Sequence, residues 1–161
     1  MIRETIGFLM ISLVAVIALI IWLTVRNRRS KQEAAIMAPL PAVSSGELNT
    51  FYVATVFEAD PLERVWAHGF AMRGKAQLGI DEEGVSVNRT GERSFLIPAS
   101  AIHGLGKASA TLDKGVERDG LTVVHWSLGD VKVLTNFRFI SLETRKEFEA
   151  KMSQLIGAQI G

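Results

Sequence analysis

LTVVHWSLGDVKVLTNFRFISLETRKEFEAKMSQLIG, residues 121–157, is the stretch that decides the fold. It opens with two runs rich in β-branched and aromatic residues, 121–128 and 131–140, which flank the turn pair Gly129-Asp130. The second run places its less polar side chains on one face at the period of two that a strand requires: Val131, Val133, Thr135, Phe137 and Phe139. The pattern therefore predicts an antiparallel hairpin.

A helix is expected directly after this hairpin. Ser141 is a suitable N-cap, and Glu143 in the first turn suits the positive end of the helix dipole. The apolar residues recur at helical spacing and form one stripe: Phe148, Met152, Leu155 and Ile156. Gly157 is the expected end of the helix. Such a helix has one face to bury and can close an open end of a sheet.

Upstream of the hairpin the same β pattern recurs in short runs. The expected strands are Phe51–Phe57, Trp66–Arg73 continued through a bend at Gly74 into Lys75–Ile80, Gly84–Arg89, Arg93–Ile97 and Gly106–Leu112. Residues 99–105 form a short connection with one helical turn. Because no helix separates these strands, the sheet must be mainly antiparallel. The predicted fold is mainly β, a seven-stranded antiparallel barrel or sandwich capped by the C-terminal helix.

Ahead of the β-rich region, residues 32–49 have no sustained periodicity and contain Pro39, Pro41 and the run Ser44-Ser45-Gly46. This is the composition of a flexible linker. The chain is thus expected to divide into an N-terminal segment 1–31, a linker 32–49 and one domain, 50–161.

The N-terminal segment has the composition of a transmembrane helix. Residues 5–25 contain no charged side chain, and a helix of that length spans the roughly 30 Å of a hydrocarbon core. Trp22 stands where an interfacial aromatic residue is expected. A cleaved signal peptide is the alternative, but basic residues rather than a small-residue cleavage site follow the apolar run. We therefore expect an uncleaved membrane anchor.

Four basic residues within six positions follow the helix: Arg26, Arg28, Arg29 and Lys31. Only Arg3 and the terminal amine precede it. Because basic residues are retained on the cytoplasmic side, the C-terminal domain is expected in the cytoplasm, at the cell membrane. The cluster also suits contact with anionic lipid headgroups.

Several stretches of the domain resemble a known family. They include YVAT at 52–55, DPLERV at 60–65, HGFAMRGKAQLGI at 68–80, GERSFLIPASAI at 91–102 and DGLTVVHWSLGD at 119–130. The sequence resembles actinobacterial single-pass membrane proteins with a cytoplasmic pleckstrin-homology-like (PH-like) domain, often described only as membrane or export proteins. The resemblance implies a bent seven-stranded barrel capped by a C-terminal helix. Eukaryotic PH domains keep a tryptophan in that helix, whereas Phe148 stands here, and this departure weakens the transfer of phosphoinositide binding from the family.

No constellation for catalysis, cofactor binding or metal binding stands out. The chain has no cysteine, and His68, His103 and His125 lack the spacing of a zinc motif, so ordinary hydrogen bonds are expected for them. The glycines of 104–109 miss both phosphate-loop templates. Residues 51–161 carry 13 of the 18 basic and 14 of the 17 acidic side chains, a balance that argues against nucleic acid as a partner. We predict a protein that is not an enzyme.

One set of basic residues is a candidate ligand or lipid contact: Arg64, Arg73, Lys75 and Arg93. In phosphoinositide-binding PH domains, basic residues of the comparable region meet phosphates, and Arg suits bidentate phosphate binding. Glu58, Asp60 and Glu63 lie in the same loop as Arg64 and would repel an anion. The alternative interpretation is a set of ordinary surface charges.

These observations predict a membrane-tethered interaction module that docks a protein partner at the cytoplasmic membrane face. Two alternatives stay open, binding of anionic lipid headgroups and membership of a membrane transport or export assembly. The tether favours the protein partner, because it raises the effective concentration of the domain near other membrane proteins.

Overall fold

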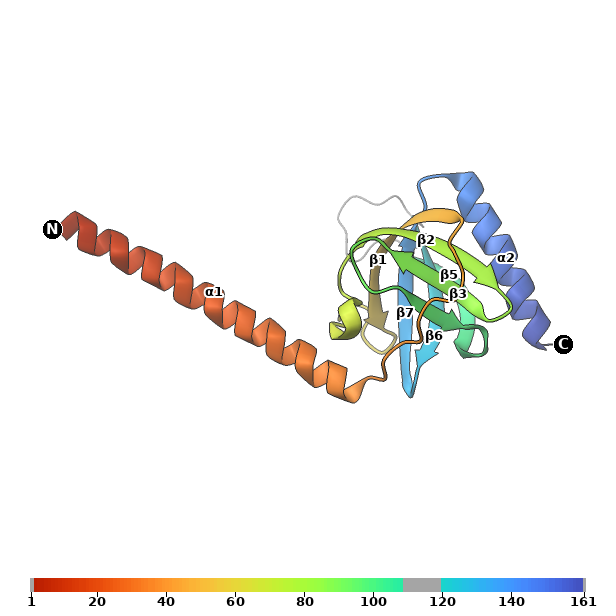
Figure 1. Cartoon of the computed structure of the whole chain (residues 1–161), viewed down its shortest axis with the longest axis horizontal. Helices are drawn as coiled ribbons and strands as arrows, with labels where there is room; N and C mark the ends of the chain where they lie inside the picture. Colours follow the sequence, from red (N-terminus) through yellow and green to blue (C-terminus); the bar gives the residue numbers. More distant parts are fainter. Residues whose placement is uncertain (1, 109–119, 161) are drawn as a thin grey trace.

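The computed structural model describes residues 2–108 and 120–160, in which a long N-terminal helix projects away from a β-rich domain (Figure 1). This helix, α1, runs from Ile2 to Ala35, ten residues past the end that we expected at residue 25. It is long and apolar enough to cross a membrane. The extension has a local cause, since an i,i+4 ion pair joins Arg29 Nε to Glu33 Oε1 at 3.0 Å.

Seven strands form one antiparallel sheet in the order β4-β3-β2-β1-β7-β6-β5. Their bounds are β1 Leu48–Phe57, β2 Gly74–Asp81, β3 Gly84–Arg89, β4 Phe95–Pro98, β5 Ile102–Ala108, β6 Leu121–Leu128 and β7 Val131–Arg138. The expected hairpin is β6–β7, in which Leu128 pairs with Val131. The structure thus confirms the mainly β, seven-stranded antiparallel fold.

Two expected strands differ in extent. Residues 66–73 are not a strand: they hold the short 3-10 helix η1 (Ala67–Gly69), because His68 and Gly69 have left-handed φ angles of 54° and 75° that an extended strand excludes. The strand expected at 106–112 is β5, which starts at Ile102, and the positions beyond Ala108 lie outside the described residues. The helical turn expected within 99–105 is the 3-10 helix η2 (Ala99–Ala101).

The sheet curls so that its two halves face each other across one aromatic core. Phe95 of β4 stacks on Trp126 of β6, with ring centroids 6.2 Å apart and planes 14° apart. The largest fully buried side chains come from both halves: Trp126, Tyr52, Phe70, Phe95, Phe137 and Phe148. This shared core is what makes the curved sheet a barrel.

Helix α2 (Leu142–Ile160) closes one end of the barrel (Figure 1). Phe148 and Met152 are fully buried, and Leu155 and Ile156 pack against the same core, as the apolar stripe predicts. Ser141 caps the helix, its Oγ accepting a hydrogen bond from the Glu143 amide at 3.2 Å. The expected stop at Gly157 is wrong, because the helix continues to Ile160.

Residues 36–47, here called the strap, lie along the outer face of β2, β3 and β4. The amides of Val43 and Ser44 both donate to Ser86 Oγ at 3.1 Å, and Asn88 Nδ2 donates to the Ser44 carbonyl at 3.0 Å. The Leu96 amide donates to the Leu40 carbonyl at 2.8 Å, so the strap also pairs with edge strand β4. Residues 36–47 therefore contact the sheet at several points, although their composition is that of a flexible linker.

The close approach of the strap depends on a glycine. A Cβ at Gly79 of β2 would lie 2.6 Å from both Ser44 Oγ and the Ser45 carbonyl oxygen, so a larger residue would push the strap away. The small and polar residues of the strap therefore allow it to lie close against the sheet. In an isolated segment the same residues would only make the backbone flexible.

Candidate functional site

The last turn of α1 is fastened to η1 by side chains of the helix. Gln32 Oε1 accepts hydrogen bonds from the amides of Trp66 at 2.6 Å and Ala67 at 3.3 Å, and Glu33 Oε1 accepts one from the His68 amide at 3.3 Å. These amides begin the short helix and have no partner within it. The membrane-type helix and the domain therefore meet through specific hydrogen bonds.

A second set of contacts continues at the start of the strap. The His68 ring nitrogen Nε2 lies 3.1 Å from the Ile36 carbonyl oxygen. The Ile36 side chain is only 6% exposed and belongs to the core. The apolar core thus reaches the residue directly after α1, which holds the end of the helix against the domain.

A buried arginine, Arg89, lies behind the contacts that join α1 and the strap to η1. Arg89, at the end of β3, donates from Nη1 to the Gly69 carbonyl at 2.8 Å, and from Nε and Nη2 to the Arg93 carbonyl at 2.9 and 2.7 Å. Its guanidinium lies over three aromatic rings, with the closest centroid, that of Tyr52, 4.8 Å away. Arg89 therefore joins η1 to the turn between β3 and β4.

Burial shifts the pKa values of Arg89 and Tyr52. Desolvation lowers the pKa of Arg89, and the nearby Tyr52 and Glu92 oppose that change. Burial also raises the pKa of Tyr52, whose hydroxyl donates to the Phe70 carbonyl at 2.6 Å. The guanidinium stays charged at neutral pH, held by carbonyl oxygens and ring faces.

Sequence reasoning missed Arg89, although a signal was present. In β3 it follows Val85 and Val87 at a spacing of two, so it lies on their inward face. An arginine in register with buried valines predicts a buried cation, and a buried cation needs acceptors nearby.

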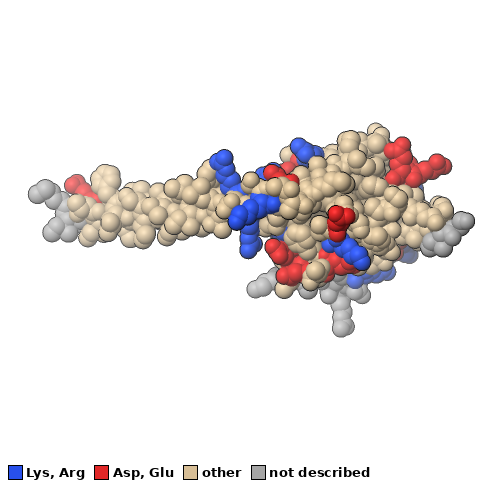
Figure 2. Space-filling model, turned by 90° about the horizontal axis from the view of Figure 1, so that it is seen from below, with Lys and Arg blue, Asp and Glu red and all other residues tan. Residues whose placement is uncertain are grey.

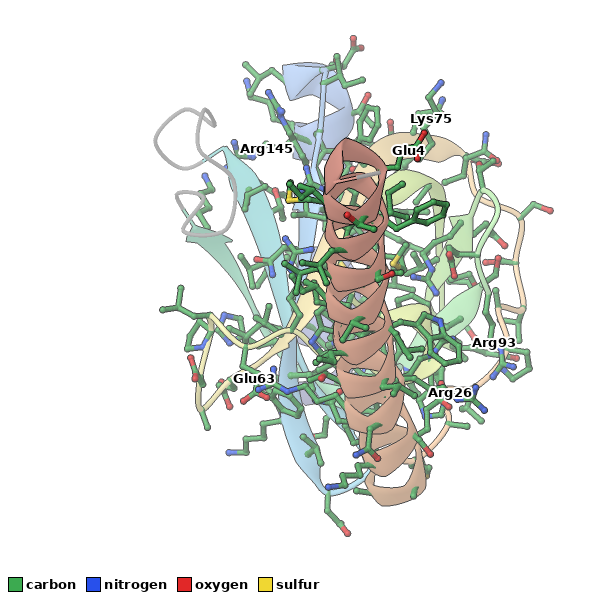
Figure 3. All side chains as sticks on the ribbon, turned by 90° about the vertical axis from the view of Figure 1, so that its left-hand side faces the viewer. Glu4, Arg26, Glu63, Lys75, Arg93 and Arg145 are labelled. Carbon is green, nitrogen blue, oxygen red and sulfur yellow. The ribbon has the colours of Figure 1, made fainter. Side chains whose placement is uncertain are left out.

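A pocket of about 240 Å³, here called the junction pocket, lies where these elements meet. Its walls come from α1, η1 and the β3–β4 turn, and its lining residues are Arg29, Glu33, His68, Gly69, Glu92 and Arg93. Two guanidinium groups and two carboxylates therefore face one small space. In Figure 3 the helix runs in front of this side of the domain, with Arg26 of the helix and Arg93 of the domain labelled.

The structure places the four candidate ligand residues, Arg64, Arg73, Lys75 and Arg93, at different positions on the domain. Arg93 lines the junction pocket, whereas Arg64 Nη1 donates to the Ala71 carbonyl at 3.2 Å within its own loop. Arg73 and Lys75 are exposed at the start of β2, and Figure 3 places Lys75 well apart from Arg93. A phosphate site that uses all four residues together stays a prediction, and of the four Arg93 lines the junction pocket.

The basic residues after the apolar run gather where α1 meets the domain (Figure 2). Arg26, Arg28, Arg29 and Lys31 are all exposed. The Arg26 guanidinium lies 5.0 Å from the Trp22 ring centroid. A tryptophan and an arginine in contact at the end of an apolar helix suit a membrane–water interface.

The histidines make ordinary hydrogen bonds at separate places. His103 Nε2 lies 2.6 Å from Ser127 Oγ, and His125 Nδ1 lies 3.3 Å from Glu58 Oε1. Within residues 2–108 and 120–160, no group of three histidine or acidic side chains could hold a metal ion.

A curved seven-stranded antiparallel sheet capped by a C-terminal helix is the architecture of PH-like domains. Residues 33–153 match the model of the family described as bacterial PH domain-like. This chain belongs to that family, and the match begins at the last turn of α1 and includes the strap. No curated protein matches the chain.

Proposed function

We propose that this protein is a membrane-tethered interaction module that docks a protein partner at the cytoplasmic membrane face and is not an enzyme. One observation carries the proposal: a fully exposed apolar helix leads directly into hydrogen bonds with a PH-like domain. Large exposed side chains, such as Phe8 at 74% and Leu9 at 72%, need an apolar surrounding, which a bilayer supplies.

The charge of the domain supports a protein partner over an anionic lipid. Residues 51–161 carry 13 basic and 14 acidic side chains, so the domain has no broad positive field. The basic residues at the helix end are the exception, and they favour anionic lipid headgroups as the second candidate. The resemblance to actinobacterial membrane and export proteins fits either role.

The orientation of the protein in the membrane can be tested with single introduced cysteines, because the natural sequence contains none. A single cysteine at Asp130→Cys, in the exposed β6–β7 turn, is expected to react with a membrane-impermeant maleimide only after cells are permeabilised. Glu4→Cys, on the other side of the helix, is expected to react in intact cells. The reverse pattern would contradict the cytoplasmic domain.

Partner docking can be tested by affinity capture in mild detergent. The full chain is compared with a chain whose residues 1–25 are replaced by an unrelated transmembrane helix. A protein captured equally by both chains, and lost when surface residues of the domain are changed, is the expected result. A protein captured only with the native helix would assign docking to the membrane segment instead.

A further inference from the structure

The junction pocket lies at the level of lipid headgroups if α1 spans the bilayer. The apolar run ends at Val25, and Arg29 follows four residues later, about 6 Å further along the helix axis. The headgroup layer on each side of a bilayer is roughly 5–7 Å thick. Because Arg29 and Arg93 line the same pocket, the β3–β4 turn is held at that depth as well.

The pocket holds charges of both signs, and not all of their hydrogen-bonding capacity is used, although Glu92 interacts electrostatically with the buried Arg89. Among the described residues, no hydrogen bond or ion pair occupies the Arg93 guanidinium or the Glu92 carboxylate, although both line the pocket. Arg29 uses Nε for Glu33, which leaves its terminal nitrogens as donors. A ligand with one cationic and one anionic group would satisfy this set better than an anion alone.

The walls of the pocket are fixed by hydrogen bonds that do not use the Arg93 guanidinium or the Glu92 carboxylate. Arg89 holds the Gly69 and Arg93 carbonyls together from behind. Glu92 Oε2 lies only 2.9 Å from the place of a Cβ at Gly69, so the carboxylate lies closely over this glycine. A site whose walls are already ordered loses little entropy when a ligand binds.

We propose that the junction pocket binds the headgroup of a zwitterionic phospholipid with a phosphate and a primary ammonium, the phosphoethanolamine class. The phosphate lies between Arg29 and Arg93, since guanidinium groups bind phosphate bidentately. The ammonium donates hydrogen bonds to Glu92 and to Glu33. The pocket volume of about 240 Å³ has room for several waters and so for a small headgroup.

The same chemistry disfavours choline and glycerol headgroups. A choline headgroup has no N–H to donate to the two carboxylates, and a glycerol headgroup offers them no cation. The proposal rests on the membrane tether of the proposed function, and it does not depend on which protein docks. It assigns the pocket a positioning role, in which one bound lipid fixes the β3–β4 turn at the bilayer surface.

The test uses the full chain in detergent micelles with equal amounts of phosphatidylethanolamine, phosphatidylcholine and phosphatidylglycerol. Bound lipid is counted by native mass spectrometry. We expect phosphatidylethanolamine adducts at least fivefold above the other two, and loss of that preference in Arg93→Ala and in Glu92→Gln. The matched controls Arg138→Ala and Glu82→Gln, at exposed positions on β7 and the β2–β3 turn, should keep it.

Soluble headgroups separate headgroup recognition from acyl-chain contacts. Glycerophosphoethanolamine should displace the lipid adduct, and glycerophosphocholine should not. Equal displacement by both soluble headgroups, or equal adducts of all three lipids in the native chain, would overturn the proposal. Loss of the chain from membranes on alkaline extraction would instead contradict the tether, before any lipid preference is measured.

Discussion

Arg89 is the residue on which the geometry of the junction depends most. Its three hydrogen bonds reach two carbonyl oxygens on different segments, and its charge is compensated by acceptors and ring faces. A lysine has a single ammonium and lacks the planar fork that spans both carbonyls. The site therefore requires arginine rather than any cation.

Arg89→Lys should lower the free energy of unfolding by about 2–4 kcal/mol, because hydrogen bonds to a charged group contribute roughly 1.5–3 kcal/mol each and at least one is lost. The measurement is thermal unfolding of the full chain in micelles, followed by near-UV circular dichroism. Arg138→Lys, at an exposed position, is the control and should change stability by less than about 0.5 kcal/mol. Equal midpoints for the two variants would show that the buried fork contributes nothing.

The strap is the element that connects the membrane helix to the sheet. Two of its amides donate hydrogen bonds to Ser86 Oγ, and its Leu40 carbonyl accepts one from Leu96 of the edge strand β4. Without the strap, that backbone group of the edge strand would have no partner in the sheet. Its contacts fix where the domain stands relative to the end of α1. A chain with this element displaced would keep its fold but lose that fixed relation.

Gly79→Val should displace the strap, since its side chain would enter the space of Ser44. Hydrogen exchange of peptides from residues 36–47 is expected to speed up tenfold or more in the full chain. The control is Gly104→Val in β5, where nothing lies within 4 Å of an added Cβ. Ser86→Ala, which removes the acceptor without adding bulk, should act in the same direction as Gly79→Val. Unchanged exchange in both would show that these contacts do not hold the strap.

Helix α2 acts on the domain through its buried stripe. Phe148→Ala should cost about 3–5 kcal/mol, because it leaves a cavity among the Phe137 and Phe139 rings. The exposed Gln154→Ala on the same helix is the control. Thermal unfolding of the full chain gives both values, and a loss below about 1 kcal/mol for Phe148→Ala would contradict the capping role of the helix.

At the scale of the whole molecule, α1 and the domain meet through the side chains of Gln32 and Glu33 and through the buried Ile36. The match to the PH domain-like family also begins at residue 33. We propose that the folded unit starts near residue 32, rather than at the boundary of residue 50 that the composition predicts.

A fragment of residues 32–161 should therefore be more stable than one of residues 50–161. The shorter fragment loses the buried side chains of Ile36 and Leu48, which contribute roughly 1.5–3 kcal/mol each, and it uncovers Leu96. The expected difference in unfolding midpoint is about 10 °C or more, measured by calorimetry in buffer. Equal midpoints would place the start of the folded unit at residue 50.

Local periodicity in the sequence determined the elements that depend on neighbouring residues. The unbroken apolar run of α1, the period-two pattern of the β6–β7 hairpin and the helical stripe of α2 are each visible within one segment, and the structure confirms them. Strand β3 was predicted with its correct bounds for the same reason. The family resemblance added the PH-like barrel, and the family match confirms it.

Tertiary structure alone decided the strap and the junction pocket, because both are made by residues far apart in the chain. Ser44 and Ser86 are 42 positions apart, and Gln32 and Trp66 are 34 positions apart. No periodicity within the strap reveals such contacts, so its prolines, serines and glycine predict a free linker when taken alone. The curled sheet brings Gly79 and Ser86 under the strap and Arg93 beside Arg29, and only that arrangement turns ordinary polar residues into a connected site.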